Sequence, residues 1–122
     1  MKEDLLEKEI KKMAMILQRV AGMMKKGDYQ EALQIATPSY NGQLMDDFLK
    51  SEKWDISNRF TLEELAFQLD LLYYRLLAQY RSAEPDRELR LKFLAMATKF
   101  SGLNPATFDF SLQMKIDEIE KL

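Results

Sequence analysis

Hydrophobic residues recur at intervals of three and four along most of the chain. The clearest run has spacings of 4, 3, 4, 3 and 4 and consists of Leu6, Ile10, Met13, Leu17, Val20 and Met24. Such spacing places all six side chains on one stripe of a helix, predicted over residues 3–26. Lys25 and Lys26 suit the last turn of this helix, and Gly27 can adopt the left-handed conformation that ends it.

Two shorter helices are expected next. Asp28 is a candidate N-cap, and Glu31 three positions later completes the pattern of a capping box. We expect this second helix to end at Thr37-Pro38, because the residue before a proline avoids the helical conformation. A third helix is predicted over residues 40–53, where the hydrophobic positions are Leu44, Met45, Phe48 and Leu49.

Three more helices are predicted after a loop at residues 54–60. The fourth covers residues 62–81 and starts with Thr61 as N-cap, Glu64 as its partner, and Phe60 and Leu65 as a hydrophobic staple. The fifth follows Pro85, ends at Gly102 and has hydrophobic positions at Leu89, Phe93, Met96, Ala97 and Phe100. The sixth opens at Asn104-Pro105 and carries Phe108, Leu112, Ile116 and Ile119.

About six helices joined by short polar connections predict an all-α fold. In this fold, antiparallel helical hairpins pack into a bundle. The longest connection has about seven residues, which is too short for a linker between domains. We therefore expect residues 1–122 to form a single helical domain.

The turn between the first two helices reads Gly27-Asp28-Tyr29-Gln30-Glu31-Ala32-Leu33. It resembles the turn and second-helix opening of a tetratricopeptide repeat, with Gly27, Tyr29 and Ala32 at matching positions. In that family the glycine closes the turn, the aromatic residue packs into the hairpin, and the alanine allows close helix approach. No second copy follows at the period of the repeat, so the resemblance implies a single tetratricopeptide-like hairpin. The layout of the whole chain also resembles a family of small, uncharacterised bacterial helical proteins, which implies no catalytic residues.

The chain contains no His and no Cys. This removes the commonest general base, the usual zinc ligands and thiol nucleophiles. Glu63 and Asp70 lie seven positions apart on one helical face, but di-metal sites in helix bundles also use histidine. Glu63 and Glu64 have a simpler role near a helix N-terminus, where acidic side chains are favourable. We therefore expect no enzyme activity, no metal and no cofactor.

The charge balance gives no general attraction to nucleic acids. Lys and Arg number 18 and Asp and Glu number 20, so the net charge is −2. Basic residues of the first helix alternate with acidic ones, as on a solvated helix face. No segment approaches the roughly 18 consecutive apolar residues of a membrane span, and the acidic N-terminus does not resemble a signal peptide. We expect a cytoplasmic protein with no nucleic-acid partner and no membrane span.

The fourth predicted helix is hydrophobic on two faces. One face consists of Leu62, Leu65, Ala66, Leu69, Leu72, Tyr73, Leu76, Leu77 and Tyr80, and the other of Phe67, Leu71, Tyr74 and Ala78. Such a helix is either the central helix of the bundle or keeps one face for a partner. A small domain of six helices usually surrounds a central one.

These surfaces suggest a noncatalytic protein–protein interaction module. We expect Phe67, Leu71 and Tyr74 to anchor a protein partner, with Trp54 as a contact at the rim. The stripe of the first helix either packs in the core or forms a homodimer. The alternative function is small-molecule binding in an inter-helix pocket lined by Tyr73, Arg75 and Tyr80.

Overall fold

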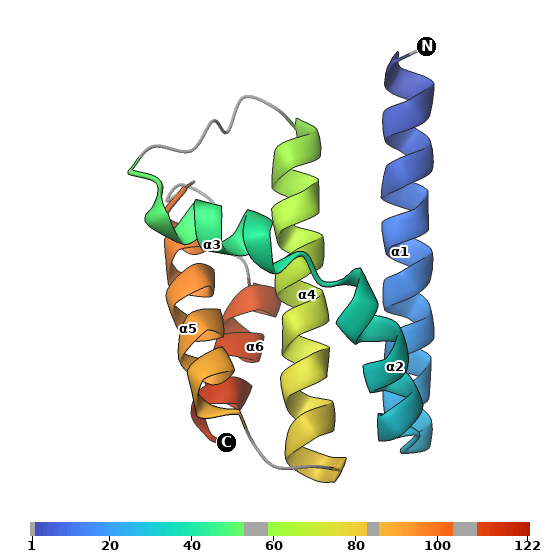
Figure 1. The fold of residues 1–122 in the computed structure, drawn as a ribbon, viewed down its shortest axis with the longest axis vertical. Helices are drawn as coiled ribbons and strands as arrows, with labels where there is room; N and C mark the ends of the chain where they lie inside the picture. Colours follow the sequence, from blue (N-terminus) through green and yellow to red (C-terminus); the bar gives the residue numbers. More distant parts are fainter. Residues whose placement is uncertain (1, 53–58, 83–85, 104–109) are drawn as a thin grey trace.

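The computed structural model describes residues 2–52, 59–82, 86–103 and 110–122, which form six α-helices and contain no strand. The helices are α1 (Lys2–Lys26), α2 (Tyr29–Ser39), α3 (Gly42–Lys50), α4 (Arg59–Ser82), α5 (Arg87–Gly102) and α6 (Phe110–Glu120). α1 and α2 form an antiparallel hairpin, and α4, α5 and α6 alternate in direction (Figure 1). α3 runs crosswise from the α4 side of the bundle to α5 (Figure 1). The predicted all-α class is confirmed.

α4 is the central helix, packed by α1 and α2 on one side and by α5 and α6 on the other (Figure 1). Most of its first apolar face lies in the larger core cluster, although Tyr80 is exposed. The buried residues of this cluster are Met45, Phe48, Leu65, Leu69, Leu72, Tyr73, Leu76, Phe93, Met96, Ala97, Leu112, Ile116 and Ile119. The second face of α4 lies in the smaller core cluster, whose buried residues are Val20, Ala32, Ala36, Phe67 and Leu71. Both apolar faces of α4 are therefore used by the fold.

The hairpin of α1 and α2 depends on the turn at Gly27. This glycine has φ +79°, in the left-handed region that favours glycine. The Gly27 amide donates to the Met24 carbonyl at 3.2 Å, and the Asp28 amide to the Met23 carbonyl at 2.9 Å. This pair of bonds is a Schellman motif, and it confirms the predicted end of the first helix.

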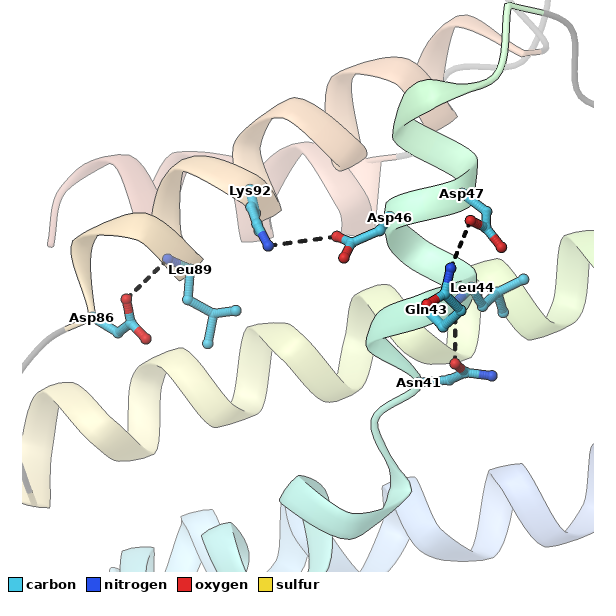
Figure 2. Close-up of polar contacts among 8 residues, drawn as sticks. All are labelled: Asn41, Gln43, Leu44, Asp46, Asp47, Asp86, Leu89 and Lys92. Carbon is cyan, nitrogen blue, oxygen red and sulfur yellow. Dashed lines mark hydrogen bonds and ion pairs between the residues drawn. The ribbon is translucent and has the colours of Figure 1, made fainter.

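The ends of α2 and the start of α3 differ from the expectation. Asp28 is at the N-cap of α2, but its side chain makes no capping hydrogen bond. α2 continues through Pro38 to Ser39, so the predicted end at Thr37-Pro38 is wrong. Pro38 lies in the last turn, where its ring suits a helical φ and only one amide hydrogen bond is lost. α3 starts later than predicted, because the Asn41 side chain caps it by accepting from the Leu44 amide at 3.0 Å (Figure 2).

The starts of the later helices show two further differences. α4 begins at Arg59, so Thr61 lies inside the helix and is not its N-cap. α5 is capped by Asp86, which accepts a hydrogen bond from the Leu89 amide at 3.1 Å (Figure 2). Pro85, Asn104-Pro105 and Phe108 lie outside the described residues.

Cations on α5 hold the ends of two other helices. The Lys99 ammonium donates to the carbonyls of Phe48, Leu49 and Ser51 at the C-terminal end of α3, with 3.2 Å to Leu49. Arg90 donates to the carbonyls of Ile119 at 3.0 Å and Glu120 at 2.7 Å, at the end of α6. Helix C-termini carry partial negative charge and unpaired carbonyls, so both contacts are favourable.

Candidate functional site

The residues predicted to anchor a partner are largely buried by their own chain. Phe67 is 7% exposed and Leu71 is 0% exposed, because Val20 of α1 and Ala32 and Ala36 of α2 pack in the same cluster. The expectation that Phe67 and Leu71 form an exposed face is therefore corrected. Tyr74 is half-buried at the edge of both clusters. Trp54 lies outside the described residues.

The three residues of the predicted ligand pocket point to different places. Tyr73 is buried against α6, Arg75 lies 5.8 Å from the centre of the Tyr40 ring, and Tyr80 lines a cavity beside α5. At about 100° per residue, position 75 faces away from positions 73 and 80. Positions 73 and 80 share a face but are separated by about two turns. The predicted pocket of Tyr73, Arg75 and Tyr80 is therefore not formed.

Tyr73 instead joins α4 to α6. Its hydroxyl donates to Glu118 at 2.6 Å, and Lys115 forms an ion pair with Asp70 at 2.6 Å beside it. Burial, together with this hydrogen bond to a carboxylate, raises the pKa of Tyr73 above its ordinary value. These contacts give Tyr73 a structural role.

Arg75 of α4 makes a cation–π contact with the ring of Tyr40. Burial and the nearby Asp46 carboxylate raise the pKa of Tyr40, and the Arg75 guanidinium partly opposes this. Gln68 of α4 binds the segment that joins α2 to α3. Its side chain accepts a hydrogen bond from the Asn41 amide at 2.8 Å and donates one to the Ser39 carbonyl at 3.2 Å. Asp46 pairs with Lys92 of α5 at 3.5 Å (Figure 2). This region fixes the crosswise position of α3.

The hydrophobic stripe of α1 is only half covered. From Met13 onward the stripe packs against the smaller core cluster, with Val20 fully buried. Leu6 is 38% exposed, its neighbour Leu5 is 64% exposed, and Ile10 belongs to neither cluster. α2 lies beside the C-terminal half of α1 only, and the N-terminal turns of α1 extend beyond the start of α4 (Figure 1). We call residues 5–12, in which Ile10 is half-buried, the uncovered half of α1.

Two cavities, both open to the surface, flank the C-terminal end of α4. The hairpin cavity has a volume of about 290 Å³ and is lined by Ala21, Met24, Lys25, Tyr29, Tyr74, Leu77 and Arg81. The end cavity has a volume of about 430 Å³ and is lined by Leu76, Tyr80, Asp86, Arg87, Arg90, Leu91 and Leu122. Both combine leucine, tyrosine and cationic side chains, the composition common in ligand and partner sites.

In the described part of the chain, no group of three acidic residues could hold a metal ion. None of the helices in this part is long and apolar enough to cross a membrane.

The sequence identified only part of the hairpin cavity. Tyr29 belongs to the turn motif and Tyr74 to the second face of α4, so both were recognised for other reasons. Lys25 and Arg81 were recognised only as residues near helix ends. Their meeting depends on how α1 and α4 are placed side by side, and no local pattern encodes that.

The chain was compared with family models, with curated proteins and with solved structures, and none of the three comparisons finds a match. The six helices agree with an all-helical family in general. The likeness of the α1–α2 hairpin to a tetratricopeptide unit stays a prediction.

Proposed function

We propose that this chain is a noncatalytic protein–protein interaction module that pairs with a second copy of itself through the uncovered half of α1. The proposal depends on one observation: the hydrophobic stripe of α1 continues past the part that the core covers. Val20 is buried, whereas Leu6 is exposed on the same stripe. Covering such a stripe with another helix is favourable by roughly 25 cal/mol for each Å² of apolar surface removed from water.

Charge supports a second copy as the occupant. The sequence stretch 2–12, which includes this half, contains four basic residues and four acidic ones, namely Lys2, Lys8, Lys11 and Lys12 with Glu3, Asp4, Glu7 and Glu9. Its net charge is therefore zero, so two copies do not repel each other as two strongly charged helices would. The 3,4 spacing also places Leu6 and Ile10 at the seam positions of a two-stranded coiled coil. The seam is short, so we expect weak pairing.

Gly27 at positive φ and the buried Ala32 support a tetratricopeptide-like geometry of the α1–α2 hairpin. A bacterial source and a cytoplasmic location stay predictions from the sequence.

Sedimentation velocity over a wide range of protein concentration tests the pairing. We expect the wild-type chain to show a concentration-dependent rise in sedimentation coefficient. The double variant Leu6→Asp/Ile10→Asp should stay monomeric, because each copy would then bury charges in the seam. Met15→Asp is the matched control, since Met15 is 63% exposed on the opposite side of the same helix. It should pair like wild type.

Circular dichroism checks that each variant keeps its helices. A wild-type chain that stays monomeric up to millimolar concentration would overturn the proposal. So would equal loss of pairing in the double variant and in Met15→Asp.

A further inference from the structure

We propose that the hairpin cavity between α1, α2 and α4 binds a small aromatic carboxylate. This site lies at the C-terminal end of α1, whereas the proposed pairing surface lies at the N-terminal end. The two proposals therefore stand or fall separately.

The charge of the cavity favours an anion. Lys25 and Arg81 both line it, and no acidic side chain does. In the described part of the chain, neither cation forms an ion pair; Arg81 only donates to the Tyr29 hydroxyl at 3.5 Å. Two cations without a carboxylate partner give a positive potential, which a carboxylate would neutralise with charge-assisted hydrogen bonds.

The walls of the cavity favour an aromatic ring. Tyr29 and Tyr74 come from α2 and α4, and the apolar part of the lining includes Met24 and Leu77. The Arg81 guanidinium already lies 5.8 Å from the centre of the Tyr29 ring. Aromatic pairs prefer stacked or edge-to-face contacts at such walls, and methionine sulfur also contacts rings favourably. A flat ring with one carboxylate meets both features of the cavity.

The volume of the hairpin cavity limits the size of the ligand, and the neighbouring end cavity is a weaker candidate site. About 290 Å³ is at the lower end of the range for ligand pockets, so the ligand has one or two rings. The end cavity is larger but a weaker anion site, because Asp86 lines it and Arg90 is held by carbonyls of α6. For a ligand of this size we expect a dissociation constant of about 1 mM or lower.

Titration of the ¹⁵N-labelled protein with 2-naphthoate, followed by amide chemical shifts, tests the proposal. The uncharged 2-naphthamide is the matched control ligand. We expect 2-naphthoate to shift amides of residues 21–29 and 74–81, and 2-naphthamide to bind at least tenfold more weakly. Arg81→Gln should weaken 2-naphthoate binding about tenfold through the lost charge-assisted hydrogen bond. Tyr29→Leu should weaken it through the lost ring contact.

Arg87→Gln is the matched control variant. It makes the same change of charge in the end cavity and should bind 2-naphthoate like wild type. The amide spectrum itself shows whether each variant is folded. Three results would overturn the proposal: no saturable shifts at several times 1 mM, equal binding of the amide, or shifts that gather around Tyr80 and disappear in Arg87→Gln.

Discussion

Lys99 of α5 binds the free carbonyl groups at the C-terminal end of α3. Its ammonium group contacts three carbonyls at the end of α3 and lies 4.9 Å from the centre of the Phe48 ring. Because α3 has only nine residues, this one side chain satisfies much of its C-terminal end.

We expect Lys99→Met to lower the free energy of unfolding by about 1–3 kcal/mol, the range for hydrogen bonds to charged groups. Lys92→Met is the control on the same helix, because Lys92 makes only an exposed ion pair with Asp46. It should cost less than about 1 kcal/mol. Urea denaturation of the three proteins measures both values. Equal costs would mean that the contacts of Lys99 with α3 contribute no more than a surface charge.

Tyr73 should make the fold sensitive to alkaline pH. Its pKa is raised in the folded state above its ordinary value near 10, so the folded chain keeps a proton that the unfolded chain loses. Stability from this residue is complete below pH 10 and falls above it, by up to about 1.4 kcal/mol for each pH unit.

The variant Tyr73→Phe cannot ionise at this position. We expect it to be less stable than wild type at pH 8, because the hydrogen bond to Glu118 is lost. Between pH 10 and pH 11 its stability should fall less steeply than that of wild type. Urea denaturation at pH 8, 10 and 11 gives the two slopes, and parallel slopes would contradict the raised pKa.

Gly22 lies inside α1 and Gly27 in the turn that follows it, and we expect their replacement by alanine to change stability in opposite directions. Gly27→Ala should destabilise the chain by about 1–2 kcal/mol, because alanine must adopt φ +79° to keep the Schellman turn. Gly22→Ala should stabilise it by up to about 1 kcal/mol, because Gly22 is inside α1 and an added Cβ meets no atom within 4 Å. Thermal unfolding followed by circular dichroism compares the two, and a shift of the same sign in both would contradict this explanation.

The periodicity of the sequence predicted the helices better than it predicted which of their residues are buried and which are exposed. Hydrophobic spacing together with helix start and stop signals predicted all six helices, and the two apolar faces of α4 were consistent with a central position. The proline failed as a stop signal, because Pro38 lies in the last turn of α2 and the helix ends only after Ser39. Phe67 and Leu71 could not be assigned to core or surface from the sequence, since that depends on which helix covers them.

At the level of the whole molecule, helix length explains why part of α1 is uncovered. At about 1.5 Å per residue, α1 is about 37 Å long and α2 about 16 Å. A short second helix cannot cover the whole stripe of a long first one. The tight turn at Gly27 places α2 beside the C-terminal half of α1, and the position of α4 beside α1 decides how much of the rest is covered. The same placement creates the hairpin cavity.

The two core clusters should also differ in how readily they open. Among the described residues, the smaller cluster has five buried members, two of them alanines, against thirteen in the larger one. Less apolar burial means a lower free energy of local opening. We therefore expect hydrogen exchange to be faster in α1 and α2 than in the buried parts of α5 and α6.

Substitutions in each cluster separate local opening from global unfolding. Leu71→Ala should cost about 2–5 kcal/mol within the smaller cluster and speed exchange mainly in α1 and α2. Phe93→Ala, in the larger cluster, should speed exchange throughout the bundle, because α4 is shared and the remaining cluster is too small to stay folded alone. Hydrogen exchange read by mass spectrometry distinguishes the two patterns. If Leu71→Ala instead speeds exchange equally in all helices, the chain opens as one unit. The α1–α2 hairpin then does not open independently of the other helices.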